Sequence, residues 1–254
     1  MSVTALASFT GHLRFSPGLA GSLLYSGPVV PTRLHAHHAF QVMLATSDAP
    51  LAMRGESGEI ALAQAFILRP DVPHAIARPS RAMVAYFEPE TLLARRLRRR
   101  LSGPSSEAEV MNSLLALRDP APTDAVSADA RLRSIAEALG GSTPACAQHP
   151  AVAGLTRILA ERLPDAPSLS VMARELGLAG STLSHLLKRD VGIPYRRFVR
   201  WQRLIAAARG MRDGMDLTTA AHAAGFADLA HLSRTFVAMF GLAPSEIARF
   251  VTWL

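Results

Sequence analysis

Residues 225–244 read GFADLAHLSRTFVAMFGLAP, and residues 177–194 read GLAGSTLSHLLKRDVGIP. In both stretches a glycine follows a leucine by nine residues, as Gly192 follows Leu183 and Gly241 follows Leu232. A turn of glycine, an apolar residue and alanine lies six or seven residues before that leucine. A glycine-containing turn between two short amphipathic helices is the sequence pattern of a helix-turn-helix, so we predict two of them in tandem.

The charge of the chain is unevenly distributed. Its 254 residues include 27 Lys and Arg against 20 Asp and Glu, a net charge of +7. From residue 149 onward there are 13 basic and 8 acidic residues. A basic segment with two helix-turn-helix patterns favours a polyanionic partner, and we predict double-stranded DNA.

Cys146 is the only cysteine, so neither a disulfide within the chain nor a thiolate zinc site can form. This composition suits a reducing compartment. No apolar run reaches the roughly 18 residues that span a bilayer, and the N-terminus lacks the basic region of a secretory signal. We therefore expect a soluble, cytoplasmic protein.

Residues 1–88 are predicted to form β-structure. Short apolar runs separated by Gly and Pro occupy residues 19–25, 39–45, 65–68 and 82–87. These Gly and Pro residues leave no room for a helix of a dozen residues between the apolar runs. Short strands at this spacing favour a small sandwich or barrel.

Helical periodicity begins at Pro89, which we expect to open a helix. Its apolar stripe consists of Leu92, Leu93, Leu97 and Leu101. The arginines of residues 95–100 fill the other faces, either as solvated surface or to attract DNA or an acidic partner. Two more helices are expected around residues 111–117 and 132–139. One candidate partner for these stripes is a second copy of the chain, which would give a homodimer.

Gly140-Gly141-Ser142-Thr143-Pro144 is the strongest linker signal. We predict a sensing and dimerisation domain over residues 1–140, with helices from about 89, a linker over 141–149 and a DNA-binding domain over 150–254. After the linker we expect only helices, over residues 152–163, 169–176, 181–190, 195–211, 217–224 and 228–240. A short last helix is expected to begin at Pro244 and to include Phe250 and Val251.

Roughly residues 150–252 resemble the C-terminal domain of the AraC/XylS family of bacterial transcription regulators. The resemblance is most specific over residues 225–245, where the turn glycines, the spacing and the closing proline match. The resemblance implies an α+β fold, with a cupin-like N-terminal β-barrel and appended helices before an all-α domain with two helix-turn-helix units. It further implies a homodimer in the bacterial cytoplasm that is not an enzyme. Its partners would be double-stranded DNA, RNA polymerase and a small-molecule effector bound in the barrel.

The same resemblance assigns residues to a DNA-binding surface. In the first repeat the exposed positions are Ser181, Thr182, Ser184, His185, Lys188 and Arg189, of which Ser181, Ser184 and His185 would face bases. In the second repeat they are Leu229, Ala230, Ser233 and Arg234. The long basic helix between the repeats offers charge for phosphates at Arg196, Arg197, Arg200 and Arg203, with Arg196 and Arg200 taken as DNA contacts. The alternative is that these arginines are solvated surface, and Arg203 could also be paired within the protein. Arg234 is the strongest single candidate for a DNA contact.

Three positions depart from the family pattern. Ala179 and Ala227 stand where Ser or Asp usually caps the recognition helix, which forgoes about 1 kcal/mol of capping at each. Asp228 can recover part of the second loss through the helix dipole. Val237 replaces a residue that is commonly basic. We therefore expect the second repeat to read sequence only weakly, with binding that depends on charge.

The N-terminal half contains two histidine motifs. His35-Ala36-His37-His38 precedes Gln41, and Pro70-Asp71-Val72-Pro73-His74 follows later. They loosely resemble the two motifs of cupin barrels, in which an H-x-H pair, a Glu four residues on and a later His bind a metal. Position 41 is Gln here, a weaker ligand for a divalent metal that supplies no charge.

Three interpretations of this cluster remain open: a metal site with dioxygenase chemistry, a pocket that hydrogen-bonds a polar effector, or packing alone. We adopt the second, with His35, His37, Gln41 and His74 as effector-binding residues and with no catalytic residue, no metal and no cofactor. The predicted function is a sequence-specific DNA-binding transcription regulator controlled by that effector. The alternatives are a constitutive dimeric regulator and a metal-dependent cupin enzyme with a DNA-binding tail. The effector, the operator and the sign of regulation cannot be derived from the sequence.

Overall fold

The computed structural model of the chain describes residues 10–17, 19, 21–101, 104–118, 121–140 and 148–254. The chain divides into two compact units. Unit 1 comprises Met1–Ala145 together with Val237–Leu254, and unit 2 comprises Cys146–Phe236. The last eighteen residues thus join the N-terminal unit rather than the helical one. Most of the predicted linker and Cys146 lie outside the described residues.

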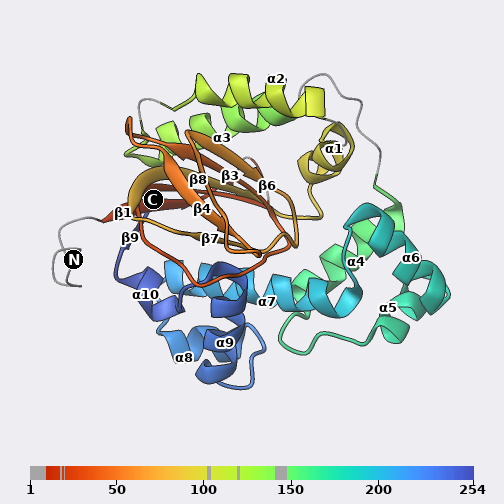
Figure 1. Cartoon of the computed structure of the whole chain (residues 1–254). Coiled ribbons are helices and arrows are strands. Elements are labelled where there is room, and N and C mark those ends of the chain that lie inside the picture. The colour runs from red at the N-terminus through yellow and green to blue at the C-terminus, as the bar shows by residue number, and fades with distance from the viewer. Residues whose placement is uncertain (1–9, 18, 20, 102–103, 119–120, 141–147) are drawn as a thin grey trace. The chain divides into compact units, whose positions relative to one another are not determined.

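Unit 1 is built on two β-sheets (Figure 1). The larger has the strand order β6-β3-β8-β2-β1-β9 and the smaller the order β5-β4-β7. The strands are β1 (Gly11–Phe15), β2 (Ser22–Val29), β3 (Phe40–Ala45), β4 (Leu51–Gly55), β5 (Ile60–Ala63), β6 (Ala65–Leu68), β7 (His74–Ile76), β8 (Ser80–Phe87) and β9 (Val251–Trp253). The α+β class predicted from the sequence is confirmed, with a β-rich N-terminal part and a helical C-terminal part.

The four predicted β-segments correspond to β2, β3, β6 and β8, although β2 begins three residues later and ends four residues later than expected. The prediction of helices alone after the linker is wrong at the end of the chain. The last helix, α10, covers only Pro244–Ala248, so Phe250 lies beyond it. Val251 opens strand β9, which pairs in parallel with β1 and stacks the ring of Trp253 on that of Phe15 at 6.0 Å.

Helices α1 (Leu92–Arg100), α2 (Pro104–Leu115) and α3 (Ala125–Gly140) cover one face of the larger sheet (Figure 1). Leu97, Leu114 and Leu132 are fully buried there against sheet residues such as Phe87. A second copy of the chain is therefore not needed to bury these stripes, and Leu92, at 42% exposure, lies outside them. The predicted start at Pro89 is also wrong. The side chain of Thr91 accepts from the Ala94 backbone N–H and caps α1, satisfying a donor that would otherwise lack a partner.

The opposite face of the larger sheet packs on the smaller one through a second apolar cluster, which includes Met43, Met53 and Val84. Both faces of the central strands are thus covered, which is why every residue of β3 is buried.

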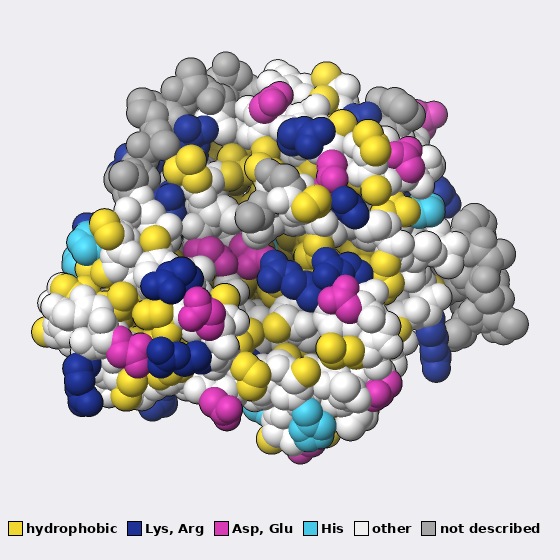
Figure 2. All heavy atoms as spheres, turned by 180° about the vertical axis from the view of Figure 1, so that it is seen from behind, with side chains coloured by type: hydrophobic (Ala, Val, Ile, Leu, Met, Phe, Trp, Pro, Cys, Tyr) yellow, Lys and Arg dark blue, Asp and Glu magenta, His cyan; other side chains and the backbone are white. Residues whose placement is uncertain are grey.

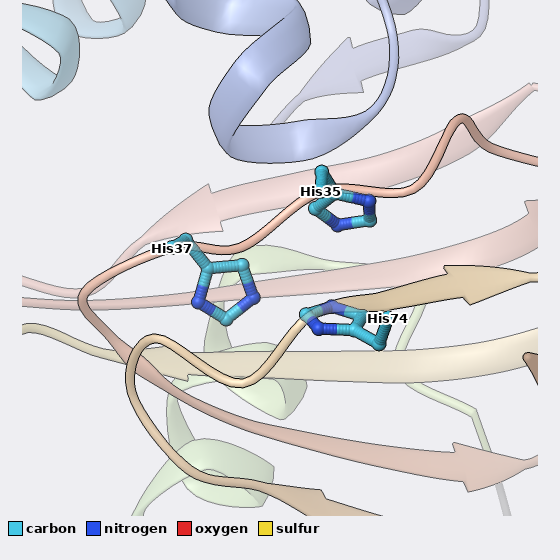
Figure 3. A group of neighbouring side chains, drawn as sticks. All are labelled: His35, His37 and His74. Carbon is cyan, nitrogen blue, oxygen red and sulfur yellow. The ribbon is translucent and has the colours of Figure 1, made fainter. Parts of the chain in front are cut away.

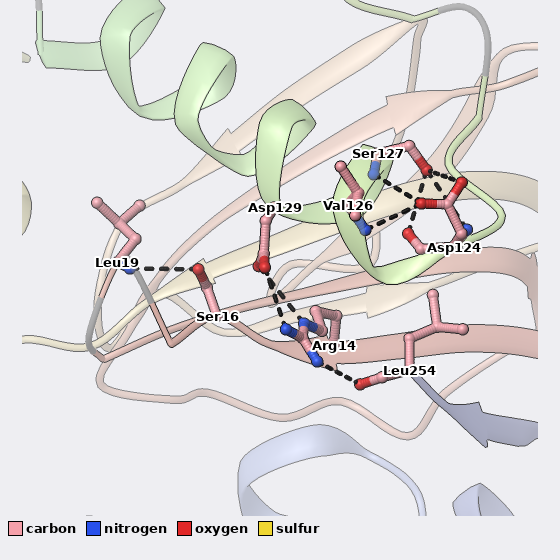
Figure 4. Close-up of polar contacts among 8 residues, drawn as sticks. All are labelled: Arg14, Ser16, Leu19, Asp124, Val126, Ser127, Asp129 and Leu254. Atoms are coloured by element: carbon pink, nitrogen blue, oxygen red, sulfur yellow. Dashed lines mark hydrogen bonds and ion pairs between the residues drawn. The ribbon is translucent and has the colours of Figure 1, made fainter.

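One arginine links three segments of unit 1 (Figure 4). The Arg14 guanidinium on β1 lies 3.1 Å from the Asp129 carboxylate on α3 and donates to the Leu254 carbonyl oxygen at 2.9 Å. At the start of α3, Asp124 accepts from the backbone N–H groups of Val126 and Ser127, each at 2.9 Å. These contacts hold α3 and the C-terminal segment to the edge of the sheet.

Unit 2 is helical in its described residues. It contains α4 (Pro150–Glu161), α5 (Leu169–Glu175), α6 (Gly180–Asp190), α7 (Tyr195–Arg212), α8 (Leu217–Ala223) and most of α9 (Leu229–Phe240). One apolar cluster joins α4, α5, α6 and the start of α7 around Leu155, Leu187 and Phe198. Among the described residues, no helix is both long and apolar enough to cross a membrane.

Candidate DNA-binding surface and histidine cluster

The first helix-turn-helix consists of α5 and α6, as predicted. Ser168 caps α5 by accepting from the Val171 backbone N–H. Gly177, in the intervening turn, has a φ of 67°, a value that glycine adopts without strain. Ala179 occupies the N-cap of α6 and makes no side-chain capping bond, so the predicted loss of this cap is confirmed.

Helix α6 has one buried and one exposed face. Leu183, Leu186 and Leu187 are buried in the core of unit 2. All six residues predicted to face DNA are exposed: Ser181, Thr182, Ser184, His185, Lys188 and Arg189. The Arg189 guanidinium lies 2.7 Å from the buried Asp190 carboxylate, which also accepts from the His149 backbone N–H. Arg189 is thus partly neutralised within the protein, so Lys188 is the stronger of the two candidates for a phosphate contact.

The second helix-turn-helix consists of α8 and α9. The Asp216 side chain caps α8 by accepting from the backbone N–H groups of Thr218 and Thr219. The prediction that α9 has lost its cap at Ala227 is wrong, because α9 begins one residue later than expected. Asp228 lies before the first helical residue, and its carboxylate accepts from the His231 backbone N–H at 2.6 Å.

On α9, the predicted DNA-facing residues differ in exposure. Ala230 and Arg234 are exposed, whereas Leu229 and Ser233 are half-buried. Leu232 and Phe236 face the interior. Arg234 is therefore the accessible cation of this helix, as expected, while Leu229 and Ser233 present less of their surface.

Helix α7 lies between the two motifs along the chain. It has 18 residues, hence about 27 Å at about 1.5 Å per residue. Arg196 and Arg200 are exposed on it. Arg203 donates to the carbonyl oxygens of Leu163 and Pro164, so the alternative that it is paired within the protein is confirmed.

Charge does not gather into a patch of one sign on the face shown in Figure 2. Lys and Arg side chains are interspersed there with Asp and Glu. The case for a nucleic-acid interface rests on the exposed residues of α6, α7 and α9.

We expect Gly225→Ala to destabilise unit 2 strongly. Gly225 has a φ of 84°, and an added Cβ would lie 2.6 Å from the Pro164 carbonyl oxygen. The strained φ and the overlap together should lower the free energy of unfolding by roughly 3 kcal/mol. The matched control is Gly177→Ala, where φ is 67° but no atom lies within 4 Å of the added Cβ. It should cost only about 1 kcal/mol. Urea unfolding checks both, and equal losses would contradict the packing at Pro164.

A cluster of three histidines lies inside unit 1 (Figure 3). His35, His37 and His74 are all buried and offer ring nitrogens within 4.8 Å of one another. His35 and His74 form an antiparallel backbone bridge, with N–H to carbonyl distances of 3.0 and 2.9 Å. The bridge explains why the two motifs meet although 39 residues separate them. The four predicted effector-binding residues therefore come together, with Gln41 reaching the cluster from β3.

The backbone fixes the orientation of each ring. In each ring Nδ1 lies close to a backbone carbonyl oxygen. The distance is 2.9 Å from His35 to the oxygen of Arg33 and 3.0 Å from His37 to the oxygen of Ala39. It is 2.8 Å from His74 to the oxygen of Val72. A carbonyl oxygen only accepts, so each Nδ1 carries the proton of its imidazole. Each Nε2 is then the nitrogen with a lone pair.

The Gln41 amide lies between two of these nitrogens. Its Oε1 is 2.6 Å from Nε2 of His37 and 3.1 Å from Nε2 of His74. Burial lowers the pKa of His37 to about 3 and that of His35 to about 4, with further lowering from His74. Burial also lowers the pKa of His74, against the effect of its hydrogen bond to the Val72 carbonyl. The three imidazoles are therefore neutral at physiological pH.

Two residues that sequence reasoning did not assign to the site fix the loop before His74. The Asp71 backbone N–H donates to the His37 carbonyl oxygen, and its carboxylate lies 2.6 Å from Nδ1 of His38. Asp71 adopts a φ of 62°, a left-handed conformation that Asp tolerates better than most residues. The signal available in the sequence is that His38 lies within the first motif and Asp71 within the second.

Unit 1 also places the C-terminal end of α9 against the segment that carries His35 and His37, residues 33–38, which we call the histidine loop. The Arg33 backbone N–H donates to the Gly241 carbonyl oxygen at 3.1 Å, and that of Ala36 to the Ala238 oxygen at 3.4 Å. The Phe240 ring lies 6.3 Å from the His37 ring. A Cβ on Gly241 would lie 2.7 Å from Nδ1 of His35, so this close approach requires glycine.

Comparison with known proteins places residues 172–249 in a family described as "Helix-turn-helix domain". Over 77 residues the chain is 35% identical to the HTH-type transcriptional activator RhaS of Pectobacterium atrosepticum. That match covers 30% of this chain and 28% of RhaS, so the chain matches less than a third of the length of this relative.

Among solved structures, the fold resembles apo ToxT from Vibrio cholerae with a TM-score of 0.57 and 12% identity, over 92% of this chain and 98% of that one. ToxT bound to an unsaturated fatty acid matches with a TM-score of 0.54 and 12% identity, over 96% of this chain and 94% of that one. These likenesses establish a shared fold.

Proposed function

We propose that this member of the AraC/XylS family is a sequence-specific DNA-binding regulator of transcription that responds to a small ligand held by His35, His37, Gln41 and His74. The family membership predicted from the sequence is confirmed by the match over residues 172–249 and by the similarity to RhaS. We further propose that the protein is not an enzyme, that it acts in the bacterial cytoplasm as a homodimer, and that RNA polymerase is a partner.

One observation carries the proposed ligand control. The backbone of the histidine loop is hydrogen-bonded to Ala238 and Gly241, at and just beyond the end of α9. Arg234, the predicted DNA contact, lies on the same continuous helix one turn before Ala238. A ligand that moves the histidine loop thus acts on residues that terminate a recognition helix. Regulation by a ligand requires that the ligand bind two conformations of the protein with different affinity. The contact of the histidine loop with Ala238 and Gly241 is a part of the structure that can differ between two such conformations.

ToxT, which shares this fold, has been solved with a bound unsaturated fatty acid, and this supports ligand binding by the present chain. The lining of the site differs in kind from what a fatty acid requires, because the residues that converge here are imidazoles and an amide. We therefore expect a polar ligand for this chain.

The DNA-binding part of the proposal is tested on genomic fragments selected by the full chain. We expect Arg234→Ala to weaken binding to a selected fragment at least about tenfold, in the range for removal of a side chain that binds a base or a phosphate. Arg249→Ala is the matched control, since Arg249 is also exposed but lies at the end of α10. Electrophoretic mobility shift measures both, and equal affinities of the two variants would contradict the assignment of α9 as a recognition helix.

A further inference from the structure

Strand β5 presents an unpaired backbone edge in unit 1. It is the terminal strand of the smaller sheet, whose order is β5-β4-β7. The opposite edge of that sheet is occupied, because His74 on β7 forms the backbone bridge with His35. In the described part of the chain, no backbone hydrogen bond to a segment other than β4 involves Ile60 or Leu62. The outer edge of β5 can therefore accept another strand.

The alternation of the β4–β5 pair determines which backbone groups point to this edge. The Gly55 backbone N–H donates to the Glu59 carbonyl oxygen, so these two residues form a hydrogen-bonded pair of the antiparallel ladder. Such pairs recur at every second position, so Ala61 also turns its N–H and C=O groups toward β4. The backbone groups of Ile60 and Leu62 consequently point away from β4, toward the unpaired edge.

The side chains of Ile60 and Leu62 are exposed as well. They lie opposite Arg54 and Ala52 of β4, on the face of the smaller sheet that is turned away from the larger one. Their exposed fractions are 48% and 57%. Edge strands usually carry a charge, a proline or a bulge that prevents pairing with another chain. Residues 60–68 contain no charged residue, no Gly and no Pro, so β5 lacks this protection.

We propose that β5 pairs antiparallel with the β5 of a second copy of this chain, around a two-fold axis at Ala61. The two smaller sheets then join into one continuous sheet, in the order β7-β4-β5-β5-β4-β7. The apolar stripes of α1, α2 and α3 cannot serve as this surface, because they are buried within unit 1. The proposal names the surface of the homodimer in the proposed function and rests on that part of it.

A second copy fits this edge because the edge is complementary to itself. With Ala61 opposite the partner's Ala61, Ile60 faces the partner's Leu62, and each such pair exchanges two backbone hydrogen bonds. The side chains of Ile60 and Leu62 then cover each other across the strand pair. Glu59 lies opposite the partner's Ala63, so the two Glu59 residues are about 14 Å apart, beyond the Debye length of about 8 Å. No like charges therefore meet in the strand pair.

The pairing is limited to residues 59–63 of each chain. At Gln64 the chain passes from the smaller to the larger sheet, where the Gln64 carbonyl oxygen accepts from the Ala45 backbone N–H at 2.8 Å. A strand pair of this length is small beside the roughly 1,200–2,000 Å² of a stable interface. We therefore expect a reversible dimer, with a dissociation constant at the micromolar end of the range for protein complexes.

Sedimentation velocity of the full chain, from well below to well above micromolar concentration, measures the association. We expect conversion of monomer to dimer over this range. Ala61→Lys places two like charges opposite each other on the axis and should weaken association at least about tenfold. Val126→Lys is the matched control, since Val126 is 78% exposed on α3 and lies outside the pairing. Equal association of the two variants would overturn the proposal. So would a monomeric wild-type chain, whose β5 would then be open to an extended segment of another protein.

Mixing two variants excludes misfolding as the explanation. Ala61→Glu alone should also associate weakly, because two carboxylates then meet on the axis. An equimolar mixture of Ala61→Lys and Ala61→Glu should associate about as well as the wild type, since opposite charges face each other. A mixture that stays monomeric would overturn the pairing around Ala61.

Mobility shift on a selected genomic fragment separates the dimer surface from the function. A chain that binds DNA but dimerises equally well with Ala61→Lys leaves the proposed function standing and overturns β5 as its dimer surface. A chain that dimerises through β5 as described but binds no fragment supports the surface and overturns the proposed function.

Discussion

Phe198→Ala is expected to lower the free energy of unfolding of unit 2 by about 3–5 kcal/mol, the usual loss for a large side chain removed from a core. Phe198 has no exposed surface and packs in the apolar cluster that joins α4, α5 and α6 to α7. Since domains are typically stable by only about 5–15 kcal/mol, this change removes much of the total. Urea denaturation followed by circular dichroism measures the loss.

Arg196→Ala on the same helix is the control for Phe198→Ala. Arg196 is exposed, so its removal should change stability by no more than about 0.5 kcal/mol. Similar midpoints for the two variants would show that α7 does not pack as described.

The second large effect is expected from removing Arg196 and Arg200 together. If both bind phosphates, the slope of log affinity against log salt should become less steep by about 1.8, that is about 0.9 for each phosphate that is no longer neutralised. The affinity itself should fall roughly tenfold or more in moderate salt. A mixed-sequence duplex suffices as the probe, because this part of the binding is independent of sequence.

Arg157 and Arg162, also replaced together by alanine, form the matched control. Both lie at the end of α4, where their guanidinium groups pair with the carboxylates of Glu161 and Glu175. We expect an unchanged salt slope for this pair. A slope that shifts equally in both double variants would mean that net charge alone, and not α7, determines the binding.

The helix-turn-helix pair could be predicted from the sequence because its information is local. Gly177 and Gly225 supply positive φ at the turns, and Leu183 and Leu232 mark the buried side of the following helices. Periodicity and turn residues act within about ten positions along the chain, which is the range that sequence reasoning resolves. The sequence predicts only a helix-dipole contribution from Asp228 and not the side-chain cap, because a shift of one residue in the start of a helix leaves the periodicity unchanged.

What the sequence could not supply depends on distant contacts. Strand β9 has three residues, too few to show alternation, and it exists because β1 offers an unpaired edge. The histidine motifs were visible, but the sequence does not contain the carbonyl partners that orient the rings. Which carbonyl oxygen each ring contacts depends on the conformation of the loops, for example on the positive φ of Asp71. The sequence therefore suggested which residues meet, and the structure determined which nitrogen each presents.

The pairing of β9 with β1 also sets the order in which the protein can be completed during synthesis. Gly11 pairs with Val251, so residues separated by 240 positions must meet before the edge of the larger sheet is covered. On the ribosome, β1 and β2 emerge early, yet that edge stays open until residue 253 has been made. An exposed strand edge can pair with another chain, so crowded nascent chains have a route to misassembly. Closing so long a loop is also slow, and we expect the last phase of refolding to report the docking of Trp253 on Phe15.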